Sequence, residues 1–263
     1  MTMTKNVPLP ERTSHSSRRE PAISAADEAA LNDPIWSALN DRHRVFAWGN
    51  DLAMRYRNDI APFAALRNSS PEAFAALEEI VAPGERVALF STKPRPTLRS
   101  FEVFQTLSCV QMVALNLSGD TSIRMETPTI VRLGRNDVPE MLQLTRLTNP
   151  GPFKERTLEL GAYIGVRDRG ILVAMAGERM QFTQYVEISA VCVHPDYRGK
   201  GYARLLLTTL MQEITERRMM PFLHVLAENT GAIALYESLG FVIRTACLID
   251  VCQKSGDATQ RPE

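Results

Sequence analysis

A short loop rich in glycine and positive charge carries the strongest chemical signal in the sequence. It spans residues 198–203, RGKGYA, between an apolar run and an amphipathic stretch. The first N–H groups of a helix lack intrahelical partners, and the helix dipole favours an anion at that end. Gly199 and Gly201 let the backbone approach a ligand closely, while Arg198 and Lys200 add positive charge. The composition and position of this loop predict a phosphate-binding site.

The segments around the loop indicate the elements that must position it. Residues 186–193 are predicted to form a buried strand, and residues 201–218 an amphipathic helix because apolar side chains recur at i, i+3 and i+4. A strand at 221–227 follows, and then a helix that Asn229 can cap and that Gly240 can end in a left-handed conformation. Strands alternating with helices predict an α/β fold with a mixed sheet.

Two stretches in this half resemble the GNAT superfamily of N-acyltransferases, most closely its glycine N-acyltransferase-like branch. They are VEISAVCVHPDYRGKGYARLLLTTL and PFLHVLAENTGAIALYESLGF. Arg198-x-x-Gly201-x-Ala203 matches the acyl-CoA pyrophosphate loop of the family, and residues 229–241 match its second signature. The resemblance covers about residues 128–252. It implies a GNAT fold that uses acetyl-CoA as co-substrate and no metal.

The resemblance also implies roles for individual residues. Glu187 matches a catalytic glutamate that could act through one water as general base; the alternatives are a pair with an arginine or an exposed strand residue. Tyr236 matches the general acid of the family, with packing against the sheet as the alternative. The main chain at 191–193 would stabilise the thioester oxyanion. The implied cofactor-binding residues are Val191, Cys192, Val193, Arg198, Gly199, Lys200, Gly201, Tyr202, Ala203 and Asn229.

The remaining histidines and cysteines predict no metal site. His194 precedes a proline and is predicted to be a turn residue, and His224 is predicted to be a core or pocket-wall residue. No two cysteines form a CxxC pair, so buried thiols in a reducing compartment are expected. The four are Cys109, Cys192, Cys247 and Cys252.

The N-terminal half predicts a second unit without a site of its own. Residues 27–120 are predicted to be an α+β domain, with one helix starting near Pro34 and another capped by Ser70. The resemblance implies that this half is a degenerate copy of the GNAT fold, and its lack of a phosphate loop makes an independent CoA site doubtful. Trp36 and Trp48 are predicted to be core anchors.

The ends of the two units are predicted from composition. Polar segments at 1–26 and 253–263 are expected to be tails, the first of them disordered, and residues 120–128 a linker. The first segment has no apolar run typical of a signal peptide. The longest uncharged stretch, 103–119, contains polar residues and falls short of the roughly 20 apolar residues that a membrane helix needs.

The balance of charges restricts the kinds of partner that the protein is expected to bind. Lys plus Arg and Asp plus Glu both number 30, so no overall basic field attracts nucleic acid or an anionic membrane. A cytoplasmic enzyme is expected, and a homodimer is left open. The expected reaction moves an acetyl or other short acyl group to a primary amine of a small molecule or amino acid, by direct attack in a ternary complex. The acceptor would contact residues 149–160 and the N-terminal half. The alternatives are a peptide or protein amine, or a non-catalytic module that binds CoA or a partner.

Overall fold

The computed structural model describes residues 23–93, 100–115 and 128–256. Most of the predicted N-terminal tail, nearly all of the predicted linker and the last residues of the chain lie outside these ranges. Within them the helices are too short or too polar to span a bilayer.

Helices and short strands make up the described N-terminal half. The elements are α1 (Ala25–Asn32), α2 (Pro34–Asn40), the 3-10 turn η1 (Arg44–Phe46), β1 (Ala47–Gly49), β2 (Ala53–Tyr56), β3 (Phe63–Leu66), α3 (Pro71–Ile80), β4 (Arg86–Ser91) and β5 (Phe101–Ala114).

The C-terminal half alternates longer strands with helices. Its elements are β6 (Ile130–Arg132), η2 (Arg135–Asp137), α4 (Val138–Thr148), η3 (Thr157–Leu160), β7 (Tyr163–Asp168), β8 (Ile171–Phe182), β9 (Tyr185–Val193), η4 (Pro195–Tyr197), α5 (Tyr202–Glu216), β10 (Met220–Leu226), α6 (Thr230–Ser238) and β11 (Phe241–Lys254).

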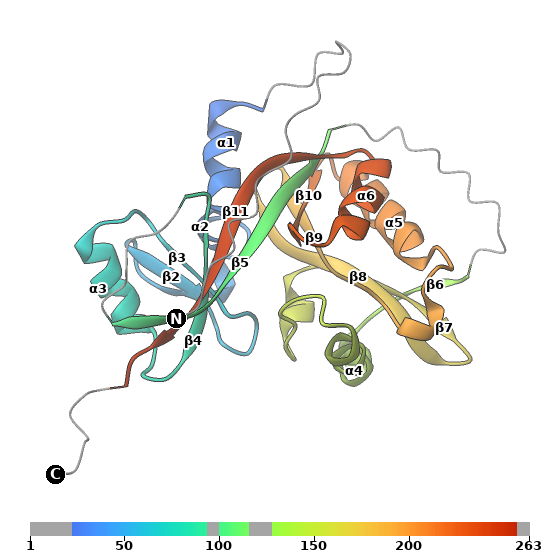
Figure 1. Ribbon diagram of the computed structural model, residues 1–263, viewed down its shortest axis with the longest axis horizontal. Coiled ribbons are helices and arrows are strands. Elements are labelled where there is room, and N and C mark those ends of the chain that lie inside the picture. The colour runs from blue at the N-terminus through green and yellow to red at the C-terminus, as the bar shows by residue number, and fades with distance from the viewer. Residues whose placement is uncertain (1–22, 94–99, 116–127, 257–263) are drawn as a thin grey trace.

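All strands of the described residues join one sheet in the order β1-β2-β3-β4-β11-β5-β10-β9-β8-β7-β6 (Figure 1). The same pattern appears from either side of the central β11–β5 pair. The parallel strands β3 and β4 are connected through α3, as the parallel strands β9 and β10 are connected through α5. β4 and β10 then each pair antiparallel with a central strand. This repeated topology supports the prediction that the N-terminal half is a degenerate copy of one fold.

The two halves exchange their last strands. β5 of the N-terminal half lies between β10 and β11, and β11 of the C-terminal half lies between β4 and β5. The β5–β11 pairing runs from Phe101 opposite Lys254 to Ala114 opposite Phe241. The predicted boundary between 27–120 and 128–252 therefore separates two repeats in sequence, whereas backbone hydrogen bonds join them in one sheet.

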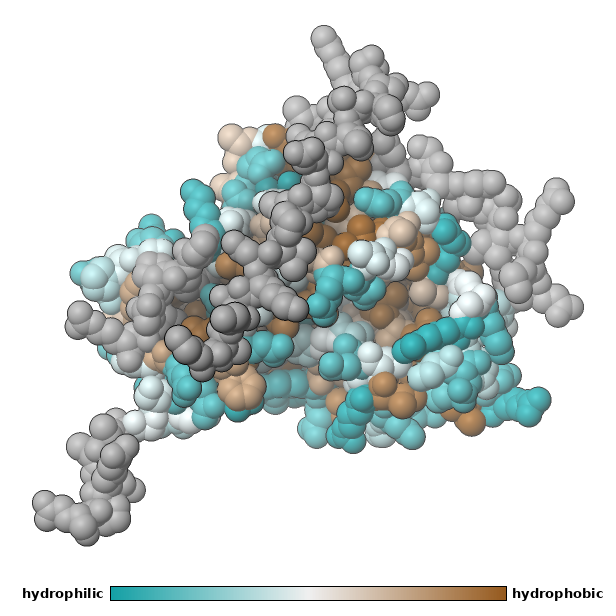
Figure 2. Space-filling model, viewed as in Figure 1, coloured by the Kyte–Doolittle hydropathy of each residue, from teal (hydrophilic) through white to brown (hydrophobic). Residues whose placement is uncertain are grey.

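Helices cover both faces of the sheet in the C-terminal half. α5 and α6 pack on one face, through an apolar cluster that includes Leu206, Leu210, Val186, Ile188 and Tyr236. α4 packs on the opposite face, over β8 and β9, and α1 and α2 cover that face further along (Figure 1). Figure 2 shows hydrophilic side chains along the lower rim of the molecule and a hydrophobic area between α1 and α6.

Some local predictions from the sequence are confirmed by the structure, and one is wrong. The caps are confirmed: Ser70 Oγ accepts from the first turn of α3, and Asn229 Oδ1 from that of α6, both at 3.2 Å. All four cysteines are buried and free, as predicted. The prediction for Trp48 is wrong, because its side chain is 62% exposed on the short strand β1, whereas Trp36 is half-buried against the core.

The single helix predicted around Pro34 is two helices. α1 begins at Ala25, inside the predicted tail, with Ser24 as its cap. It ends before Pro34, whose ring and missing N–H are incompatible with a helix interior, and Asp33 caps α2. The strands β1, β2 and β3 were not predicted from the sequence, since each has only three or four residues.

Candidate active site

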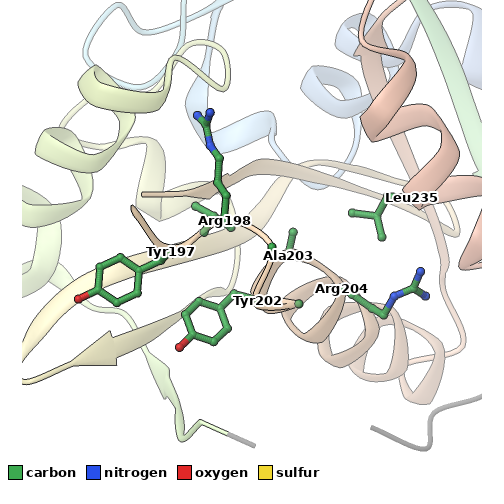
Figure 3. A pocket seen from close by; sticks show the side chains of 9 residues that line it. Tyr197, Arg198, Tyr202, Ala203, Arg204 and Leu235 are labelled. Atoms are coloured by element: carbon green, nitrogen blue, oxygen red, sulfur yellow. The ribbon is translucent and has the colours of Figure 1, made fainter. Parts of the chain in front are cut away.

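The predicted phosphate loop lies at the N-terminus of the 15-residue helix α5. Gly199 and Gly201 both have φ of +77°, a left-handed conformation that glycine adopts without strain. A hollow of about 270 Å³ opens at this loop (Figure 3). Its lining residues are Val193, Tyr197, Arg198, Gly199, Gly201, Tyr202, Ala203, Arg204 and Leu235.

Six of the ten predicted cofactor-binding residues line this hollow, and four do not. Cys192 is buried on the opposite face, against α4, and Val191 packs under α5 and α6. The Lys200 ammonium lies over the Tyr197 ring, 4.5 Å from its centroid. Asn229 caps α6 through its side chain. The binding role of each residue stays a prediction.

Three lining residues were not singled out from the sequence. The rings of Tyr197 and Tyr202 stack with centroids 6.5 Å apart, and the Tyr197 hydroxyl donates to Asp168 at 2.7 Å. Figure 3 shows these two rings side by side, with Arg198 directed away from them and Leu235 across the hollow. Arg204 bonds Ser238 at 2.7 Å and so joins α5 to α6. Tyr197 could have been found from its place directly before the loop.

An opening between β9 and β10 connects the loop to the middle of the sheet. The two strands pair only from Tyr185 opposite Met220 to Glu187 opposite Phe222. Beyond that point β10 continues along β5 alone, so among the described residues, positions 188–193 of β9 have no strand partner on this edge. β9 also bulges there, with Ala190 at φ +52°. Backbone groups on this edge are free to bind a carbonyl placed between the strands.

Glu187 lies at the vertex of this opening and is ion-paired. Its carboxylate accepts from Arg179 Nε at 2.7 Å, from Arg179 Nη2 at 2.5 Å and from His224 Nδ1 at 2.7 Å. The side chain is 0% exposed. Burial alone would raise the pKa of Glu187, but the charge and hydrogen bonds of Arg179 and the bond to His224 outweigh it and lower the pKa to about 2. The structure thus shows the arginine pair that the sequence left open as the alternative.

The hydrogen-bond network fixes the proton on His224. Gln111 Nε2 donates to the Leu31 carbonyl at 2.8 Å, and Gln111 Oε1 accepts from Arg244 Nε at 2.5 Å. This orientation directs Gln111 Nε2 to His224 Nε2, 3.0 Å away, so His224 Nε2 must accept. The imidazole therefore donates through Nδ1 to Glu187, at 2.7 Å.

Tyr236 lies on the other face of the sheet from Glu187. α6 places it in the cluster under α5, 9% exposed, with its ring 6.0 Å from that of Phe241. Burial raises the pKa of Tyr236 to about 12, so its hydroxyl is protonated at neutral pH. That hydroxyl has no hydrogen-bond partner in the described part of the chain. The opening between β9 and β10 lies between the two faces that carry Tyr236 and Glu187.

Other predicted residues have structural roles, and two unpredicted ones join the site. His194 starts the turn η4, and its Nδ1 faces the backbone N–H of Asp196 at 3.3 Å. His224 is in the pocket wall or core, as predicted, with a side chain 4% exposed. Arg179 and Gln111 were missed because a charge or amide within an apolar strand gives no sign of its partner. Groups of residues suited to a metal ion are absent from the described ranges.

Comparisons with known proteins identify the family. The family model "Acetyltransferase (GNAT) family" matches residues 137–241. The [ribosomal protein bS18]-alanine N-acetyltransferase of Escherichia coli K12 is 34% identical over 120 residues, which cover 43% of this chain and 80% of that one. N-alpha-acetyltransferase RimI of Mycobacterium tuberculosis is 39% identical over 83 residues, 30% of this chain and 51% of its own.

Similarity to a solved structure extends over both halves. A GNAT-family acetyltransferase structure from Novosphingobium aromaticivorans matches with a TM-score of 0.77 and 35% identity, covering 86% of this chain and 98% of its own. This coverage is too large for the C-terminal half alone, so the similarity includes much of the N-terminal half. Together with the glycine-rich loop at the start of α5 and the separation of β9 from β10, these similarities show that the chain belongs to the GNAT family of acetyltransferases and is an N-acetyltransferase.

Proposed function

We propose that the protein transfers an acetyl group from acetyl-CoA to the α-amino group of a small acceptor such as an amino-acid amide or a dipeptide. One observation carries this proposal: the described titratable groups at the vertex of the opening offer no free base. The Glu187 carboxylate already accepts three hydrogen bonds and has a pKa of about 2. The second ring nitrogen of His224, Nε2, already accepts a hydrogen bond from Gln111.

An enzyme without a free base favours an amine that loses its proton easily. An α-amino group next to an amide bond, as in a peptide or an amino-acid amide, has a pKa near 7.7–8.0, so roughly a quarter of it is neutral at pH 7.4, whereas a lysine-type amine with a pKa near 10.4 is only about 0.1% neutral. The neutral form alone has the lone pair needed for attack. The α-amine therefore has an advantage of more than about 100-fold before any contact with the protein.

The reaction balances with Tyr236 as the only catalytic acid. The amine loses one proton to water, its nitrogen bonds the thioester carbon, and the carbon–sulfur bond breaks. Tyr236 donates the proton that the departing sulfur takes up, and the second amine proton, released as the amide forms, returns through water to the Tyr236 oxygen. We propose that the amides of residues 199–203 with Arg198 hold the CoA diphosphate, and that the unpaired main chain at 191–193 binds the carbonyl oxygen.

Coverage of the acceptor face supports a small acceptor. The N-terminal half packs over this face: the Arg179 guanidinium lies over the Phe63 ring at 4.8 Å, and Tyr56 and Phe63 are 0% and 3% exposed. The loop after α4 is also fixed to that half, since Arg156 pairs with Asp59 at 2.7 Å. An extended polypeptide needs an open groove, which this packing narrows.

A protein N-terminus is the second candidate acceptor. It is favoured by the names of two relatives, one for the alanine of ribosomal protein bS18 and one for N-alpha-acetylation. Both names describe an α-amine, in agreement with the chemistry proposed here.

Thiol release from acetyl-CoA tests the proposal with three classes of amine. The panel contains amino-acid amides and dipeptides, longer peptides with a free N-terminus, and Nα-acetyl-lysine as a matched acceptor that has only a side-chain amine. We expect turnover with the amides and dipeptides and at least 100-fold less with Nα-acetyl-lysine at pH 7.4. Preference for the longer peptides would select the second candidate. Preference for Nα-acetyl-lysine would refute the α-amine proposal, and binding of acetyl-CoA without turnover on any amine would refute catalysis.

A further inference from the structure

The hydroxyl of Tyr163 is buried without a partner. Tyr163 is 2% exposed on β7, and its oxygen has no hydrogen-bond partner in the part of the chain that the structure describes. Buried polar side-chain atoms are nearly always paired, so an unpaired one needs an explanation. In those residues the same condition is met only by Ser91 Oγ, on β4 of the N-terminal half.

The register of three strands directs this ring towards the opening. Tyr163 of β7 lies opposite Gly177 of β8, and Gly177 lies opposite Ser189 of β9. A Cβ added to Gly177 would lie 2.2 to 2.5 Å from three ring atoms of Tyr163. The ring therefore crosses β8 directly over Gly177 and carries the hydroxyl towards β9. Ser189 and Ala190 are the β9 residues at the end of this row, where the strand bulges and its outer edge is unpaired.

Electrostatic contacts agree with this position. Burial raises the pKa of Tyr163 above its ordinary value. Among the nearby groups, Arg179 lowers this pKa, whereas Glu187 and Cys192 raise it. Glu187 and Cys192 flank the bulge of β9. The edge of the Phe153 ring packs on Tyr163 with centroids 5.6 Å apart, and Phe153 belongs to the loop predicted to face the acceptor.

We infer that Tyr163 binds the acceptor amine on the side of the sheet opposite α5 and α6. Its oxygen accepts one N–H of the neutral amine and turns the nitrogen lone pair towards the thioester carbon at the edge of β9. Gly177 is required because any larger residue would displace the ring. This inference rests on the proposed function, and it assigns the acceptor side of the reaction to a hydroxyl that nothing else in the described structure uses.

Tyr163→Phe tests the inference because it keeps the ring and removes only the unpaired oxygen. We expect kcat/KM for the best acceptor to fall by at least about 10-fold, while KM for acetyl-CoA stays within about twofold of wild type. The melting temperature should stay equal or rise, because the variant removes an unsatisfied buried group. The matched control is Tyr56→Phe, whose hydroxyl is paired with His43 at 2.9 Å, and for which the melting temperature should fall.

The outcomes separate the two proposals. If wild type releases thiol with an amine and Tyr163→Phe keeps its acceptor kcat/KM, the role of Tyr163 is refuted and the proposed function stands. A melting temperature that falls as in Tyr56→Phe, together with a loss of activity, would indicate a structural role and also refute the inference. If wild type releases no thiol with any amine, the proposed function fails and this inference fails with it.

Discussion

Replacing Glu187 by Gln distinguishes the role predicted from the sequence from the one that the structure favours. The substitution preserves the shape of the side chain and removes the negative charge of the carboxylate to which Arg179 and His224 donate. Arg179 would then be a guanidinium 9% exposed without its counter-ion. Burying an uncompensated charge is strongly unfavourable, so Glu187→Gln should first of all destabilise the fold.

The size of this effect follows from the burial of the pair. Removing one partner of a buried ion pair costs about 3–5 kcal/mol. The pKa gives a comparable value, since a carboxyl with an ordinary pKa of 4.5 and a folded pKa of about 2 contributes roughly 3 kcal/mol. For a chain of this size each kcal/mol lowers the melting temperature by about 2–4 °C. The expected decrease is therefore about 6–20 °C.

The pH dependence has a definite sign. The folded pKa of Glu187 lies below its unfolded value, so its contribution is fully present above about pH 4.5 and is lost as the pH falls towards 2. Wild type should lose stability steeply across this window, and Glu187→Gln should lose less. Thermal unfolding measured from pH 3 to 8 checks both expectations.

Two further variants complete the experiment. Glu213→Gln removes one side of a half-exposed pair with Arg132 and should cost less than about 1 kcal/mol. Adding Arg179→Met to Glu187→Gln removes the stranded charge and should recover part of the lost stability. A melting temperature of Glu187→Gln within about 2 °C of wild type would refute the reasoning. A stable variant whose kcat/KM falls roughly 10²–10⁴-fold would restore the role of general base predicted from the sequence.

Three other outcomes are expected. With an α-amine acceptor, kcat/KM should rise with pH and level off near pH 8, the pKa of the amine; a plateau already at pH 6 would show that the enzyme supplies a base. Tyr236→Phe should lower kcat while acetyl-CoA still raises the melting temperature, and unchanged kcat would remove Tyr236 from the mechanism. Arg198→Ala should raise KM for acetyl-CoA at least several-fold with little change in kcat. An equal rise in the KM of acetyl-CoA and of the acceptor would contradict a specific role of Arg198 in binding CoA.

Local chemistry made the loop at 198–203 and its place before a helix predictable. Residues 198–203 combine glycine with positive charge between a strand and a helix, and each of these signals depends only on neighbours in sequence. The caps at Ser70 and Asn229 were predictable for the same reason, since each bonds an N–H three residues away. Local patterns of this kind are specified within one turn of the chain.

The surroundings of Glu187 depended on contacts between distant residues. Arg179 and Glu187 are eight residues apart on paired strands, but His224 comes from β10 and Gln111 from the other half of the chain. The type of each of these polar residues does not indicate by itself which partner it will bind. The sequence could therefore offer an arginine pair for Glu187 only as an alternative to catalysis.

By itself the sequence determined the GNAT family, the glycine-rich basic loop at 198–203 and the alternation of strands and helices around it. Only the tertiary structure decided that β5 and β11 are exchanged, that Glu187 is held by Arg179 and His224, and that Tyr163 crosses Gly177 towards β9. The physical reason is that the loop signal comes from backbone N–H groups and glycine conformations fixed by adjacent residues. Strand order, the pairing of buried charges and an unpaired hydroxyl depend on segments that meet only when the sheet forms.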